Sequence, residues 1–322
     1  MALDHYLART YLKHWCDQDA GRPIRAYRKS DGAEFPCWPA NVCMEPNGDL
    51  NQKYLAEPRT LGLFRKIWEP RWNEAVDAFR TGKFDANHKF VIAAGWASIS
   101  LTTPTTTGIG TELLERELRT LLHIIARRHP PPRSVKLEDV CIDVDPEFAK
   151  ANFTLALPRV TWRFFGQPWT ILSNSTDEPF LTSDNPSAMF GQDSLGSPPA
   201  RILPLSPDMC VSTLMDFNLV VPEHFKLEDL QSRIAAKVSF EKSDLERARF
   251  VNCLTVKHAG DLVFSSKADA DVAALVASLR QSGVRLDHTA MSMDATKAVL
   301  TIARMGIRKV APAQKDRRPG SG

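Results

Sequence analysis

The chain has 322 residues, of which 43% are hydrophobic and 25% are charged, as is ordinary for a globular protein. Its formal net charge of +3 does not by itself indicate nucleic-acid binding, because a binding face needs clustered positive charge. Residues 1–10 contain no apolar signal segment, and no apolar run is long enough to span a membrane, so we expect a cytoplasmic protein without a membrane partner.

The first half of the sequence predicts mostly helices, because apolar residues recur at helical spacing. A run that is apolar on nearly all sides predicts a buried central helix. Pro70 should interrupt the helical pattern around it, and Thr111 should cap a strongly amphipathic helix. The expected helices are residues 1–16, 52–82, 89–101 and 111–129, and the expected hairpin joins residues 24–29 and 34–38.

After residue 155, β-branched and aromatic residues dominate and turn residues recur at short intervals, which is typical of an antiparallel sheet. Two helical patterns follow, at residues 243–260 and at residues 269–283, where Gly283 should end the second helix. The expected strands are residues 159–165, 168–175, 179–183, 200–206, 209–215 and 261–266.

These elements predict the α+β class, with an N-terminal helical layer packed on a C-terminal antiparallel sheet that carries further helices. We expect one domain over residues 1–310, with a mainly helical half at 1–150 and a sheet-containing half at 151–310. Residues 311–322 have almost no apolar content, so we expect a disordered tail there.

The common nucleotide-binding, metalloprotease, hydrolase and EF-hand motifs are absent from the sequence, which disfavours those chemistries. The six cysteines form no CxxC pair, so we expect reduced and mostly buried thiols. A zinc site built from His14, Cys16, Cys37 and Cys43 would lack closely spaced ligand pairs, and we disfavour it.

The stretch PFLTSDNPSAMF, residues 179–190, places Asp184 directly after a short predicted strand. One interpretation is a structural turn, in which Asp184 or Asn185 binds nearby backbone groups and Pro186 fixes the exit of the chain. The other is a carboxylate presented at a sheet edge to a metal, a base or a cation. Composition alone favours the turn.

His5 and Arg9 lie four residues apart in the first predicted helix, so their side chains should point the same way. Histidine can transfer protons near neutral pH and arginine can bind phosphate through two hydrogen bonds, which together suit phosphodiester chemistry. The alternative is a structural helix with one exposed basic face. Glu69 lies between Trp68 and Pro70, where a partly buried carboxylate needs a partner.

Five segments carry a family resemblance by their order in the chain, namely HYLARTYLKHW, WEPRWNEAV, WTILSNSTDEPFLTSDNP, ILPLSP and VNCLTVKHAGDLVFSS. Together they resemble an uncharacterised, mainly bacterial group, domain-of-unknown-function family 4238. The resemblance covers about residues 5–266, and its most specific part is the Ser-Asp-Asn-Pro element. The family often has Arg-x-Pro where residues 102–104 read Thr-Thr-Pro, so the role of that arginine would be lost or would pass to Arg9.

The resemblance places six residues at family motif positions: His5, Glu69, Ser183, Asp184, Asn185 and Asn252. Some members resemble accessory genes of mobile elements and of phage defence. This context implies a nuclease-type effector that acts on RNA or DNA, by analogy and not by chemistry.

We therefore predict a nuclease that depends on a metal or on histidine. His5 would be the catalytic acid and base, Asp184 and Glu69 would be catalytic carboxylates that hold Mg²⁺, and Arg9 would bind the substrate phosphate. The other motif residues would contact the substrate: Ser183, Asn185 and Asn252. A shared site requires that the sheet edge at Asp184 lies against the segment that carries His5.

The alternative is a non-catalytic binding or sensor module that recognises a protein or a small ligand. In that case Ser183, Asp184 and Asn185 would form a structural turn, and an apolar cleft between layers would hold the ligand. A protein partner or a homo-oligomer is compatible with either function.

Overall fold

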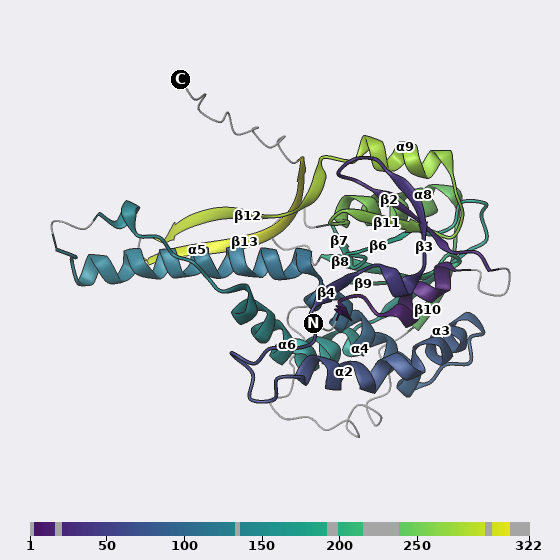
Figure 1. The fold of residues 1–322 in the computed structure, drawn as a ribbon, viewed down its shortest axis with the longest axis horizontal. Helices are drawn as coiled ribbons and strands as arrows, with labels where there is room; N and C mark the ends of the chain where they lie inside the picture. The colour runs from purple at the N-terminus through teal and green to yellow at the C-terminus, as the bar shows by residue number, and fades with distance from the viewer. Residues whose placement is uncertain are drawn as a thin grey trace.

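The structure is a computed structural model, which describes residues 3–16, 21–132, 136–191, 199–214, 238–293 and 298–309. The tail predicted at residues 311–322 lies outside the described residues. The structure has the predicted α+β class, with helices on both sides of the strands (Figure 1).

The described first part of the chain contains short strands and the single turn of α1, followed by five longer helices. The break predicted at Pro70 is confirmed as the short 3-10 helix Glu69–Arg71 between two of these helices. The elements are β1 (Leu3–His5), α1 (Arg9–Leu12), β2 (Ile24–Arg28), β3 (Glu34–Cys37), β4 (Met44–Pro46), α2 (Thr60–Trp68), α3 (Trp72–Arg80), α4 (Ala86–Thr102), α5 (Pro104–Arg128) and α6 (Pro146–Gly166).

The later part of the chain contains most of the strands. The elements are β5 (Trp169–Asn174), β6 (Thr182–Ser183), β7 (Ala188–Phe190), β8 (Ala200–Ser206), β9 (Met209–Leu214), β10 (Val238–Ser243), α8 (Leu245–His258), β11 (Leu262–Ser265), α9 (Ala270–Ser278), β12 (Ser282–Met293) and β13 (Ala298–Lys309). In Figure 1, α2, α3, α4 and α6 lie on one side of the strands, and α8 and α9 lie on the other.

The buried helix predicted at residues 89–101 is confirmed as α4, the centre of the helical layer. Trp96 of α4 stacks on Phe164 of α6 with ring centroids 4.4 Å apart. Gly95 faces Trp72 of α3, whose ring would lie 2.3 Å from an added Cβ atom. Glycine at this position therefore allows two helices to approach closely around a tryptophan.

The described strands form four sheets, two of which have only two strands each, β1 with β4 and β12 with β13. The five-stranded sheet has the order β10-β5-β9-β8-β7, in which β10 runs parallel to β5 and the other neighbours are antiparallel. The four-stranded sheet has the order β3-β2-β11-β6 and is antiparallel throughout. The predicted hairpin of β2 and β3 is confirmed, and it is built into the same sheet as the C-terminal strands.

Helix α5 begins earlier than predicted. Pro104 occupies its first position, where a missing N–H group costs nothing, and the Thr103 side chain caps the helix. Thr111 therefore lies inside the helix, so the cap predicted there is wrong. Helix α5 lies along the β12–β13 hairpin, and together they project from the rest of the molecule (Figure 1).

The helix end predicted at Gly283 is wrong, because α9 ends at Ser278 and Gly283 lies in β12. Two predicted elements are also wrong. Residues 1–16 do not form one helix, because β1 pairs with β4 before the single turn of α1 begins. Residues 159–165 lie in α6 and not in a strand, because the apolar residues of this segment pack against α4. Within the described residues, no helix is long and apolar enough to cross a membrane.

Candidate functional site

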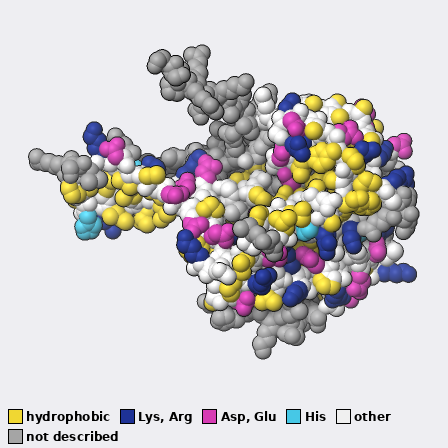
Figure 2. Space-filling model, viewed as in Figure 1, with side chains coloured by type: hydrophobic (Ala, Val, Ile, Leu, Met, Phe, Trp, Pro, Cys, Tyr) yellow, Lys and Arg dark blue, Asp and Glu magenta, His cyan; other side chains and the backbone are white. Residues whose placement is uncertain are grey.

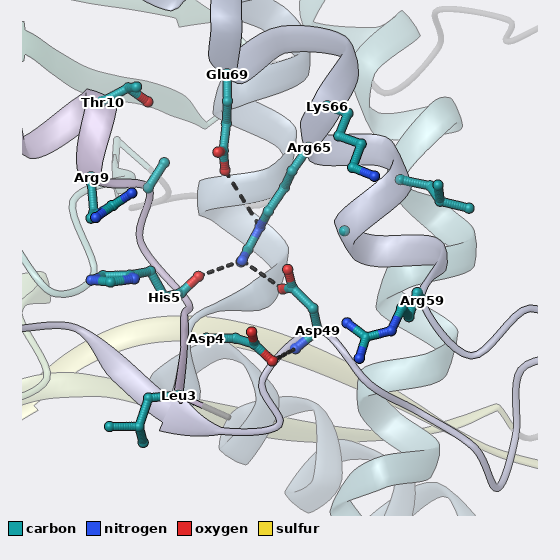
Figure 3. A pocket seen from close by; sticks show the side chains of 13 residues that line it. Leu3, Asp4, His5, Arg9, Thr10, Asp49, Arg59, Arg65, Lys66 and Glu69 are labelled. Atoms are coloured by element: carbon teal, nitrogen blue, oxygen red, sulfur yellow. Dashed lines mark hydrogen bonds and ion pairs between the residues drawn. The ribbon is translucent and has the colours of Figure 1, made fainter. Parts of the chain in front are cut away.

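A cavity of about 570 Å³ lies where β1, α1 and α2 meet (Figure 3). We call it the His5 pocket. It brings together His5, Arg9 and Glu69, three of the predicted site residues, although they come from three different elements. The full lining is Leu3, Asp4, His5, Ala8, Arg9, Thr10, Asp49, Arg59, Gly62, Leu63, Arg65, Lys66 and Glu69.

Arg65 of α2 occupies the centre of the His5 pocket (Figure 3). Its guanidinium forms an ion pair with Asp49 at 2.6 Å and approaches Glu69 at 4.0 Å. It also donates hydrogen bonds to the backbone carbonyls of His5 and Tyr6. Arg65 therefore fixes the His5 backbone to α2 and balances the two carboxylates that flank it.

The His5 ring is half-buried, and its Nε2 atom is buried without a hydrogen-bond partner in the described part of the chain. Burial lowers the pKa of His5, and the positive charges of Arg9 and Arg65 lower it further. Backbone groups of Pro39 and Ala40 form hydrogen bonds with the ring that raise the pKa, but burial and the two arginines outweigh them. His5 is therefore neutral at pH 7, and its Nε2 carries no hydrogen bond within the described residues.

The rest of the pocket provides an acid and unpaired cations. Burial raises the pKa of Glu69 above its usual range, against the opposing charge of Arg65. Among the described residues, the side chains of Arg9, Arg59 and Lys66 form no ion pair, and Thr10 Oγ1 is buried without a partner. Cations without an ion-pair partner, beside a neutral imidazole and a carboxyl, suit an anionic substrate.

Asp184 does not line the His5 pocket. Its Oδ1 accepts a hydrogen bond of 2.8 Å from the Gly260 N–H, and its Oδ2 accepts bonds of 2.8 and 3.0 Å from the N–H groups of Asp261 and Leu262. The N-terminal segment does pack against this sheet edge, since Tyr11 Oη lies 2.6 Å from Thr182 Oγ1. The expected contact of segments is therefore present, whereas His5 and Asp184 lie in different environments.

The other predicted binding residues are buried and bind the backbone. Asn185 donates to the His258 carbonyl at 2.9 Å and accepts from Thr103 Oγ1 at 2.9 Å. Asn252 accepts from the Leu181 N–H at 2.8 Å and donates to the Pro179 carbonyl at 3.0 Å. Ser183 Oγ accepts from the Asn185 N–H at 3.2 Å, so all of these residues fix the chain around β6.

The positions of Asp184 and Glu69 decide whether these two carboxylates can hold one Mg²⁺ ion, as predicted. Glu69 lies in the His5 pocket without Asp184, and Arg65 already provides positive charge between Glu69 and Asp49. The described residues contain no group of three or more His, Cys, Asp or Glu side chains placed to hold a metal. The residues present therefore do not fit a Mg²⁺ site that joins Asp184 and Glu69.

Sequence reasoning missed the residues that complete the pocket, above all Asp49, Arg59, Arg65 and Lys66. One local signal was present, because Arg65 lies four residues before Glu69 on a helical pattern. Asp49 gave no such signal, since it reaches Arg65 from the loop after β4.

Comparison with known proteins adds one match. Residues 111–269 match a family described as a protein of unknown function, DUF4238. The resemblance to DUF4238 is confirmed over this span, which is just under half of the chain. No curated protein and no solved structure matches the chain.

The DUF4238 match includes Asp184, Asn185 and Asn252, and it excludes the residues that line the His5 pocket. The matched span therefore contains the buried network around β6, which positions chain segments. The predicted resemblance at His5 and Glu69 lies outside this span and stays a prediction.

Proposed function

We propose that the His5 pocket is the acid–base site of a histidine-dependent nuclease that acts on RNA or DNA. One observation carries this proposal: a neutral His5 with an unpartnered Nε2 shares a single pocket with Arg9 and Glu69. A general base near neutral pH, a phosphate ligand and a second proton carrier are the groups that phosphodiester cleavage requires.

The reaction can be written with these groups alone. His5 Nε2 takes a proton from the attacking oxygen, either a substrate hydroxyl or water, while that oxygen forms its bond to phosphorus. The bond to the leaving oxygen breaks, and this oxygen receives a proton from His5 or from the Glu69 carboxyl. Arg9 stabilises the charge on the phosphoryl oxygens, with Arg59 and Lys66 available for neighbouring phosphates.

The test is cleavage of labelled tRNA, mRNA and DNA by the purified full chain, with Mg²⁺ and with EDTA. We expect cleavage by the wild type and a loss of about 100-fold or more in His5→Gln, since glutamine cannot transfer the proton. Thermal unfolding of His5→Gln checks that the fold survives.

His123→Gln is the matched control, because His123 is an exposed residue on α5 outside the pocket. It should cleave at the wild-type rate. Full activity in a folded His5→Gln protein, or no cleavage of any substrate by the wild type, would reject the nuclease proposal. A strict requirement for Mg²⁺ would instead favour the metal-dependent form.

The alternative function, a binding or sensor module, is supported by a second cavity. This cavity of about 420 Å³ lies between α8 and α9, and Asn252 lines it together with Leu181, Val272 and Leu275. Its apolar wall suits a small apolar ligand. Retained activity in cells by His5→Gln, together with its loss in Val272→Glu, would favour this function.

The cellular setting that we propose is phage defence in the bacterial cytoplasm, which rests on the family context alone. Cells that express the wild type should resist phage infection better than cells that express His5→Gln. Equal phage growth in the two strains would remove this setting without affecting the nuclease proposal.

A further inference from the structure

Helix α5 carries a row of four apolar side chains, of which three are exposed and one, Leu114, is half-buried. The leucine stripe, as we call it, consists of Leu114, Leu118, Leu121 and Ile125. Leu118, Leu121 and Ile125 are 44%, 50% and 48% exposed. Figure 2 shows hydrophobic side chains gathered on the arm that projects from the body.

The spacing within the leucine stripe is typical of a coiled coil. The four residues follow one another at intervals of four, three and four, which is the alternation of a and d positions in a heptad repeat. Such a row forms a narrow seam on one side of a helix, and the seam is stable when a second helix covers it.

The charges of α5 indicate which helix could cover the seam. Three acids, Glu112, Glu115 and Glu117, lie around the middle of the helix together with Arg116, whose guanidinium pairs with Glu112. The C-terminal end carries two cations, Arg127 and Arg128, with no acid beside them on the helix. A second α5 in antiparallel orientation would place Glu112 opposite Arg127, whereas a parallel copy would place Arg127 and Arg128 beside their own copies.

The leucine stripe has the same residue spacing in both directions along the helix, so it can pair with an antiparallel copy of itself. Because the intervals read the same from both ends, an antiparallel copy places Leu118 opposite Leu121 and Leu114 opposite Ile125. This arrangement has a twofold axis between Leu118 and Leu121, and two identical surfaces then meet in a closed dimer.

We propose that the protein forms a homodimer through antiparallel pairing of the leucine stripes of two α5 helices. The proposal is independent of the chemistry of the His5 pocket, because that pocket uses no residue of α5. The projection of the arm allows two bodies to lie at opposite ends of the helix pair (Figure 1).

The first test is the mass of the full chain in sedimentation experiments over a range of concentrations. The wild type should move from 36.0 kDa toward twice that mass as concentration rises. Leu121→Glu places a charge in the seam and should stay monomeric, with unchanged helix content in circular dichroism.

Leu155→Glu is the matched control, because Leu155 is 64% exposed on α6 and lies outside the leucine stripe. It should dimerise like the wild type. A wild type that stays at 36.0 kDa at every concentration, or a Leu121→Glu protein that dimerises normally, would overturn the proposal.

Disulfide trapping tests the orientation, in a Cys141→Ser background because Cys141 is exposed. The double variant Leu114→Cys with Ile125→Cys should form covalent dimers. Ile125→Cys alone should not, because the two copies of residue 125 would be about 16 Å apart along an antiparallel pair, beyond disulfide reach. Rapid crosslinking of Ile125→Cys alone would indicate a parallel pair and would overturn the proposal.

Discussion

The Asp184 carboxylate is buried and accepts three backbone N–H groups from residues 260–262. Burial raises its pKa, while the three hydrogen bonds favour the ionised form and lower it. These contacts join β6 to the turn that precedes β11. The carboxylate therefore has a structural role, and the catalytic role predicted for it has no support from its contacts.

Replacement of Asp184 by alanine tests this role. Asp184→Ala would leave three buried N–H groups without a partner, so we expect unfolding free energy to fall by about 3 kcal/mol or more. Urea denaturation measures the change, and Asp177→Ala is the control because Asp177 is exposed in the loop before β6. Equal stability of Asp184→Ala and the wild type would reopen the functional interpretation.

At the scale of elements, His258 joins the end of α8 to β7. Its Nδ1 lies 2.9 Å from the Leu254 carbonyl, and its Nε2 accepts a hydrogen bond of 3.1 Å from the Met189 N–H. This pairing requires a neutral ring with the proton on Nδ1. Burial first, and then the charges of Arg201 and Lys29, lower the pKa of His258 to about 4.

The lowered pKa predicts a loss of stability in acid. Between pH 6.5 and about pH 4 the unfolded chain binds a proton at His258 and the folded chain does not, so stability falls as pH falls. We expect this residue alone to contribute a loss of about 3 kcal/mol over that window. His14, whose pKa is also lowered to about 4 by burial, adds to the loss.

Urea denaturation at a series of pH values measures this effect. His258→Gln should be less stable than the wild type at pH 7, but its stability should fall less steeply between pH 6.5 and pH 4. His123→Gln should keep the wild-type slope, because His123 is exposed. An unchanged slope in His258→Gln would show that His258 does not titrate as described.

The sequence predicted elements well where local pattern and packing agree. The apolar run of α4, the break at Pro70 and the strands β5, β8 and β9 all lie near the predicted positions. The strand predicted at residues 159–165 is wrong. Their β-branched and aromatic side chains favour a strand locally, while packing in the core selects a helix. The helix predicted at residues 1–16 is wrong because Leu3–His5 pairs as β1 with Met44–Pro46, a partner that lies far along the chain and that local pattern does not indicate.

At the scale of the whole molecule, the two predicted halves are interleaved. Strand β2 from the first half pairs with β11 from the second, and β3 extends the same sheet beyond β2. Buried Lys29 donates hydrogen bonds to the carbonyls of Val256, Ala259 and Ser282, and Trp15 donates to the Phe180 carbonyl. The sheet class was predictable from the sequence, whereas these pairings depend on contacts between distant segments, which local pattern does not specify.

The same limit applies to the candidate site. Residue type and family resemblance indicate His5, Arg9 and Glu69 as separate candidates, whereas the pocket that joins them depends on the hydrogen bond from Arg65 to the β1 backbone. The spacing of His5 and Arg9 was interpreted on a helix that does not exist there. Their proximity instead follows from the pairing of β1 and β4, which places His5 beside the start of α1.

The interleaved sheet predicts that the first segment of the chain is needed for the second half to fold. A protein that begins at residue 39 would lack β2 and β3, the Lys29 ammonium and the Trp15 ring, and it would expose the edge of β11 that β2 covers. An unpaired strand edge and a lost buried cation each remove support from the C-terminal sheet. We expect this shortened protein to lack a cooperative thermal transition in circular dichroism, and co-expression with residues 1–38 to restore part of it. A cooperative transition in the shortened protein alone, at the wild-type temperature, would show that the C-terminal sheet folds without the N-terminal strands.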